Sequence, residues 1–170
     1  MTWSRRSFLQ SSLLALPGTA FASKDAQNWP AFRGAGARGV ADGYPTAATW
    51  NADASAGDLS GVLWKAEVPG LGHSSPIIWE NRIFVATAVR LAGKAPLRIG
   101  YYGDTKAAQD NDEQRWMILC FDKKTGKPLW ERTLRTSKPG AARHEKATHA
   151  NTTIVTDGKR LVAFFGSEGL

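Results

Sequence analysis

The sequence predicts an all-β protein, and three observations support that class. Short apolar runs rich in β-branched and aromatic residues recur from residue 62 onward. Gly, Pro, Asn and Asp separate these runs at short intervals, as expected of strands joined by turns. After the first 22 residues, no segment shows the 3.6-residue apolar periodicity of an amphipathic helix. This pattern is typical of a β-sandwich, a barrel or a propeller.

Residues 1–22 have the three parts of an export signal. Arg5 and Arg6 form a charged start, a short apolar stretch follows, and Ala20 and Ala22 supply the small residues that a signal peptidase recognises. The apolar stretch is too short to span a bilayer. Its weak hydrophobicity and the paired arginines resemble a twin-arginine signal. We therefore expect export by that route and a periplasmic or secreted location.

The remaining chain divides into an extended lead-in, residues 23–60, and a strand-rich part, residues 61–170. The lead-in is rich in Gly, Ala, Pro and Asp and has no regular apolar period. Two polar insertions, 90–113 and 135–149, interrupt the strand-rich part, and a short hairpin is predicted at 97–102 within the first of them. The predicted strands are 62–68, 76–79, 83–89, 116–121, 128–134, 152–156 and 161–165.

An internal repeat favours the propeller among the all-β folds. Residues 76–85 and 153–163 each contain an apolar strand, a polar turn and a second apolar strand. The two copies are one blade apart once the polar insertions are left out. Residues 74–134 are therefore predicted to form one full four-stranded blade, and 150–165 to begin the next. Closed propellers need about four to eight blades, so we expect a partial β-propeller and an N-terminal fragment of a longer protein.

The composition excludes several other classes of protein. The chain has 170 residues, a formal net charge of +7 and one cysteine. One cysteine permits neither an intrachain disulfide nor a four-cysteine metal site. The basic residues are scattered through polar loops, which predicts a solvated surface and no nucleic-acid partner. After the first 22 residues, no apolar run is long enough to span a membrane.

The most specific motif is a tight turn between two predicted strands. Asp122 can accept hydrogen bonds from backbone N–H groups of the turn, and Thr125 can do the same more weakly. Gly126 suits a positive φ, which a Cβ would penalise. Trp130 then projects from the outer strand with a large area to bury.

This turn resembles the Ala-x-Asp-x-x-Thr-Gly-x-x-x-Trp signature of pyrroloquinoline-quinone-type (PQQ-like) β-propellers, with Cys120 at the alanine position. In that family the tryptophan docks between neighbouring blades. A degenerate copy of the signature ends at Trp64. The segment Trp29-Pro30-Ala31-Phe32-Arg33-Gly34 is similar to the opening of secreted bacterial members. The resemblance covers nearly all of the chain after residue 22.

Two histidines are the candidate ligand-binding residues. His73 and His149 each lie just before the first strand of a predicted blade. In a propeller, such positions can face the central channel, where ligands bind. The alternative role for both side chains is structural hydrogen bonding.

Four other patterns resemble nucleotide-binding, metal-binding or reactive sites but do not favour such a site. Residues 34–39 fit the G-x-G-x-x-G fingerprint but lack the strand and helix that a nucleotide site needs. The histidines of 144–149 are five residues apart, not the four that bring both onto one helical face. Residues 110–113 have calcium-type ligands without the rest of an EF-hand loop, which favours a solvated loop tip. Cys120, alone in an apolar strand, is expected to be inert packing.

We therefore expect an exported binding or scaffold module without catalytic chemistry of its own. No catalytic or metal-binding residue is assignable, and the quinone cofactor is implied by the resemblance alone. Two alternatives stay open: the N-terminal part of a PQQ-dependent dehydrogenase oxidising alcohols or sugars, and an outer-membrane protein assembly factor. The partner, a protein or a small ligand, is not identified by the sequence.

Overall fold

The computed structural model describes residues 28–44, 46–53, 60–93, 107–108 and 110–169. The regular structure there is β apart from two three-residue 3-10 turns, η2 (Ala35–Ala37) and η4 (Gly166–Glu168), so the all-β class is confirmed. No helix in these ranges is long and apolar enough to cross a membrane. The predicted export signal and the predicted hairpin at 97–102 lie outside the described residues.

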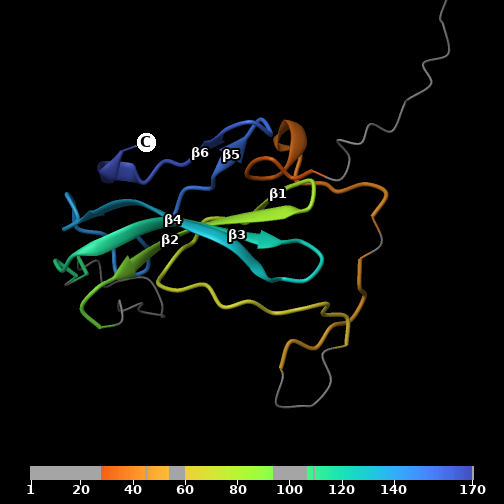
Figure 1. Cartoon of the computed structure of the whole chain (residues 1–170), viewed down its shortest axis with the longest axis horizontal. Coiled ribbons are helices and arrows are strands. Elements are labelled where there is room, and N and C mark those ends of the chain that lie inside the picture. Colours follow the sequence, from red (N-terminus) through yellow and green to blue (C-terminus); the bar gives the residue numbers. More distant parts are fainter. Residues whose placement is uncertain (1–27, 45, 54–59, 94–106, 109, 170) are drawn as a thin grey trace, which may run out of the picture.

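A four-stranded antiparallel sheet forms the centre of the molecule, with its strands in chain order (Figure 1). Each strand pairs with the next along the chain. The strands correspond to four of the predicted apolar runs, with small differences at the ends. They are β1 (Ile77–Trp79), β2 (Arg82–Arg90), β3 (Gln114–Asp122) and β4 (Pro128–Ser137).

One face of this sheet is covered by a second, two-stranded sheet, β5 (Val155–Thr156) and β6 (Leu161–Val162). Both strands are shorter than predicted. Trp116 is fully buried at the centre of this interface, and its indole N–H donates to the backbone oxygen of His149 at 3.2 Å. The buried residues that the two sheets share are Ile77, Phe84, Ala86, Ala88, Trp116, Ile118, Cys120, Ala150, Ile154, Ala163 and Phe165.

The opposite face of the sheet packs on the extended segment 62–68, which runs on the other side of the sheet from β5 and β6 (Figure 1). The strand predicted for 62–68 is wrong, because this segment forms no ladder within the described part of the chain. Its burial nevertheless alternates as in a strand: Trp64 and Ala66 are partly buried, whereas Leu63 is 92% exposed. The segment meets the face of the sheet rather than an edge, so its backbone finds no paired partner.

Candidate functional site

The turn between β3 and β4 is organised by one carboxylate. Asp122 Oδ1 accepts hydrogen bonds from the backbone N–H of Lys124 at 3.0 Å and from the N–H and hydroxyl of Thr125 at 2.8 and 2.9 Å. Asn81 donates its amide N–H to Oδ2 at 2.5 Å. Gly126 closes the turn with φ 70°. The predicted acceptor role of Asp122 and the positive φ of Gly126 are both confirmed.

These hydrogen bonds lower the pKa of Asp122 below its ordinary value of 3.8, with the Thr125 hydroxyl as the largest cause. The folded pKa therefore lies below the unfolded one. The carboxylate contributes stability above the unfolded pKa, and this contribution is lost as the pH falls through the folded pKa.

We expect the variant Asp122→Asn to be less stable than wild type at neutral pH and to approach wild type below about pH 4. The asparagine oxygen can still accept the hydrogen bonds from Lys124 and Thr125, but its NH2 group cannot accept from Asn81, and the side chain carries no charge at any pH. Urea unfolding midpoints measured across the acid range check this result. Glu131→Gln, at an exposed position on β4, is the control. A stability gap for Asp122→Asn that stays constant with pH would contradict the prediction.

Trp64 is docked on this turn. Its indole N–H donates to the backbone oxygen of Lys123 at 3.0 Å. A Cβ at Gly126 would lie 2.4 Å from two ring carbons of Trp64, so the ring occupies the space that a side chain would need. Because 59 residues separate Trp64 from Lys123, this contact ties the segment that crosses one face of the sheet to the β3–β4 turn.

A similar arrangement recurs at the turn between β5 and β6. The sequence predicts this turn at 157–160, but the sequence reasoning missed its contact with a tryptophan. A Cβ at Gly158 would lie 2.3 Å from a ring carbon of Trp79. Asp157 Oδ1 accepts from the backbone N–H of Lys159 at 2.9 Å and of Arg160 at 2.7 Å. The signal that could have revealed it is a glycine in a turn led by aspartate, the combination also found at Asp122 and Gly126.

Trp130 lies on β4 opposite Cys120 of β3. Its ring is tilted against Phe84 of β2, with 5.9 Å between ring centroids. The residue is 39% exposed, and its side chain lines a hollow between β4 and β6. A role for Trp130 between neighbouring blades stays a prediction.

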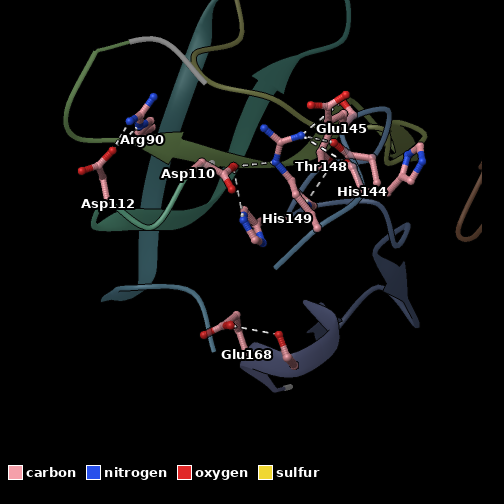
Figure 2. A network of polar contacts seen from close by, with 12 residues as sticks. Arg90, Asp110, Asp112, His144, Glu145, Thr148, His149 and Glu168 are labelled. Carbon is pink, nitrogen blue, oxygen red and sulfur yellow. Dashed lines mark hydrogen bonds and ion pairs between the residues drawn. The ribbon is translucent and has the colours of Figure 1, made fainter. Parts of the chain in front are cut away.

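A second candidate site is a buried polar cluster formed by two loops that lead into the strands (Figure 2). Asp110, Arg143 and His149 have side chains that are 2%, 4% and 8% exposed. Arg143 Nε donates to Asp110 Oδ2 at 2.6 Å. His149 Nε2 lies 3.5 Å from the same oxygen and makes no hydrogen bond with the described residues. The imidazole is held instead by an edge contact with Trp116, with 6.1 Å between ring centroids.

The loop that carries this cluster is fixed by its own hydrogen bonds. Arg143 also donates to the backbone oxygen of Ala147 at 2.7 Å. Asn151 Oδ1 accepts from the N–H and the hydroxyl of Thr148 at 2.9 and 2.8 Å. A cavity of about 160 Å³ opens beside these residues and is also lined by Ser167. The cavity offers hydroxyl, amide and imidazole groups to a small polar ligand.

The two histidines singled out by the sequence differ in their surroundings. His149 lines this cavity, whereas His73 is exposed and does not line it. The backbone N–H of His73 donates to the oxygen of Ala150 at 3.0 Å. The structure therefore brings His149 together with Asp110 and Arg143, and it leaves His73 outside that cluster.

The predicted solvated tip at 110–113 is wrong for Asp110, which is buried because its charge is matched by Arg143 from another loop. The Asp112 carboxylate accepts a hydrogen bond from the Arg90 guanidinium, as Figure 2 shows.

Cys120 is buried and has no disulfide partner, and its burial raises the pKa of its thiol. Within the described ranges, no group of three or more His, Cys, Asp or Glu side chains could hold a metal ion.

Comparison of the chain with protein-family models, with curated proteins and with solved structures found no match.

Proposed function

We propose that the chain is an exported, PQQ-like β-propeller protein that acts as a binding or scaffold module without catalytic chemistry of its own. The observation that carries this proposal is the docking of Trp64 on Gly126. A tryptophan at the end of one motif copy is seated on the aspartate-led turn of the next copy, as the resemblance implies for successive blades. The indole hydrogen bond to Lys123 fixes the register of that contact.

The layering of the molecule supports the same proposal. Segment 62–68 packs on one face of the four-stranded sheet, and the β5–β6 hairpin packs on the other. Figure 1 shows the hairpin and this segment on opposite sides of the sheet. Propellers are built from four-stranded sheets that pack face to face around an axis. In this scheme β1–β4 form one blade, 62–68 belongs to the blade before it, and β5–β6 begin the blade after it.

The residues described do not fit the quinone group that the resemblance implies. Quinoprotein dehydrogenases use adjacent cysteines and a carboxylate–calcium cluster. Here the one cysteine is buried in the core, and Asp110 and Asp112 are each bound by an arginine. These carboxylates tie the loop before β3 to the loop of Arg143 and to the end of β2, which favours a rigid module whose loops present a binding surface.

Two measurements test this function together. The first is dye-linked oxidation of alcohols and sugars by the purified protein incubated with PQQ and calcium. We expect no turnover above the blank.

The second measurement is photo-crosslinking in the exporting host from a probe placed at His73, with a probe at Gly43 as the control. We expect discrete adducts from His73 only. PQQ-dependent turnover lost in His149→Phe would replace the proposal with a dehydrogenase.

The export part of the proposal has its own test. We expect the double variant Arg5→Lys and Arg6→Lys to accumulate as unprocessed precursor in the cytoplasm, because the twin-arginine route reads the arginine pair rather than positive charge alone. Cell fractionation followed by immunoblotting measures precursor and mature protein. Replacement of Lys24 and Lys65 by arginine is the control and should leave processing unchanged. Normal periplasmic mature protein from the double variant would exclude this route.

A further inference from the structure

The pair of aspartate followed by glycine occurs twice in the chain, at Asp42-Gly43 and at Asp157-Gly158. In such a pair, the backbone nitrogen of the glycine can attack the side-chain carboxyl group of the aspartate and close a five-membered ring. Glycine favours this reaction because it has no side chain to obstruct the ring and few restrictions on its backbone. Both pairs are therefore chemically able to form the ring, and the structure gives them different surroundings.

The carboxylate of Asp157 is held by its own turn. Its Oδ1 accepts hydrogen bonds from the backbone N–H groups of Lys159 at 2.9 Å and Arg160 at 2.7 Å. These bonds, with that from Arg160 as the largest cause, hold the pKa of the Asp157 carboxyl below its ordinary value of 3.8. An ionised carboxylate is a poor target for attack, because the departing oxygen needs protons to leave as water. The hydrogen bonds therefore favour the unreactive form.

The nitrogen that would attack Asp157 is also engaged. The Gly158 N–H donates to the hydroxyl of Thr156 at 3.0 Å. A Cβ at Gly158 would lie 2.3 Å from a ring carbon of Trp79, so the indole is packed against this glycine. Ring closure at Asp157 would have to break the hydrogen bonds of the turn and rotate the glycine against the indole. Such a turn reacts only in the rare molecules in which it has opened.

The other pair, Asp42-Gly43, lies in an exposed turn. The Asp42 side chain is 77% exposed, and its Oδ2 lies 3.5 Å from a nitrogen of Arg38, which is itself 71% exposed. An exposed ion pair of this kind constrains its partners weakly. Gly43 has φ 82°, and a Cβ built there would meet nothing within 4 Å. The side chain and backbone of this pair can therefore rotate into the reacting geometry without displacing a packed group.

We propose that Asp42 is a site of spontaneous isomerisation to isoaspartate in the folded protein, and that the β5–β6 turn protects Asp157 from the same reaction. The Gly43 nitrogen bonds to Cγ of Asp42 and loses its proton, and one carboxyl oxygen leaves as water. A water molecule then opens the ring. Opening at Cγ restores aspartate, whereas opening at the main-chain carbonyl carbon leaves Gly43 joined through Cγ, which is isoaspartate. One water leaves and one enters, so no other reactant is required.

Isomerisation changes the loop in two ways. The backbone gains one methylene group between residue 42 and Gly43, and the free carboxylate moves to the former main-chain carbon. The contact of that carboxylate with Arg38 is thereby altered. Both residues of the pair lie outside the strands, so we expect the unfolding midpoint to change little. The modification does not depend on the proposed binding function, and its absence would leave that function standing.

The test keeps the purified chain at neutral pH and body temperature for several weeks in water enriched in the heavy oxygen isotope. Each ring that opens takes up one oxygen from this water, so mass spectrometry of tryptic peptides counts the events at each pair. Electron-transfer fragmentation then distinguishes isoaspartate from aspartate. We expect at least tenfold more isoaspartate at Asp42 than at Asp157, because the paired turn opens rarely. In denaturing urea, where both turns are lost, the two amounts should agree within about twofold.

Two variants separate the causes. Asp42→Glu keeps the charge at an exposed position but would need a less favourable six-membered ring, so heavy oxygen should no longer enter at residue 42. Thr156→Val removes the hydroxyl that binds the Gly158 N–H. It should raise the isoaspartate at Asp157 severalfold and leave Asp42 unchanged. Circular dichroism of each variant confirms that the fold is retained.

Either of two results would overturn the inference. One is equal isoaspartate at Asp42 and Asp157 in the folded protein. The other is an unmodified Asp42 in the folded protein at a time when the urea sample has formed isoaspartate there. If Thr156→Val leaves Asp157 unmodified, the protection assigned to the hydrogen bond of Gly158 is overturned.

Discussion

Replacing Gly126 with alanine is expected to destabilise the fold by about 3 kcal/mol, which makes it one of the two most damaging substitutions that the structure predicts. Two effects add. The backbone at Gly126 has φ 70°, a region where a non-glycine residue costs roughly 1–3 kcal/mol. The new Cβ would also lie 2.4 Å from the Trp64 ring, so the indole must leave the turn or the turn must distort. Displacing the indole also breaks its hydrogen bond to Lys123.

A second glycine separates these two effects. Gly166 has φ 62°, and a Cβ built there would meet nothing within 4 Å. Gly166→Ala should therefore cost only the backbone strain, about 1 kcal/mol. Urea unfolding of wild type and both variants, followed by far-ultraviolet circular dichroism, measures the difference. Equal losses of stability would show that Trp64 contributes nothing at the turn.

The companion variant Trp64→Phe removes the indole donor and keeps an aromatic ring over Gly126. A net loss of about 1 kcal/mol is expected for the missing hydrogen bond. In a Trp64→Ala background the clash is absent, so Gly126→Ala should cost only its strain there, as the logic of a double-mutant cycle requires. If Gly126→Ala costs as much stability in the Trp64→Ala background as in wild type, its effect comes from the turn backbone and not from the contact with Trp64.

Local patterns in the sequence were sufficient to predict the central sheet. The runs that became β1 to β4 alternate or are continuously apolar, and their turns carry Asn81 or Asp122 and Gly126. The turn chemistry was also readable, because an aspartate followed by threonine and glycine satisfies the N–H groups of a tight turn from within the same few residues. Such features depend on neighbours in the chain and need no knowledge of the fold.

Contacts between distant segments were not predictable in the same way. Segment 62–68 has the composition of a strand, but whether it pairs at an edge or packs on a face depends on the sheet that it meets. The charges of Asp110 and Arg143 looked like those of ordinary polar loops. The two side chains are buried because they pair with each other across 33 residues. The sequence of either loop alone does not reveal this pairing. The same holds for the contact of Trp79 with Gly158.

The second large effect is expected at the buried ion pair of Asp110 and Arg143. Arg143→Met would leave the Asp110 carboxylate, whose side chain is 2% exposed, without its 2.6 Å donor. Removing one partner of a buried ion pair typically costs about 3–5 kcal/mol, because the remaining charge stays desolvated. His149 cannot replace the arginine without moving, since its Nε2 lies 3.5 Å from the carboxylate and makes no hydrogen bond to it. The backbone oxygens of His144, Glu145 and Ala147 would also lose the hydrogen bonds that Arg143 donates to them.

Two further variants decide whether the lost stability reflects the unpaired charge. The double variant Arg143→Met and Asp110→Leu removes both charges and should recover most of the loss, since apolar replacement of a buried pair is often neutral. Arg90→Met, which breaks the more exposed pair with Asp112, should cost at most about 1 kcal/mol. Chemical unfolding of the four proteins at neutral pH measures all of these values. If the double variant is as unstable as Arg143→Met, the arginine acts through its carbonyl contacts, and the Asp110 pair is not what holds the two loops together.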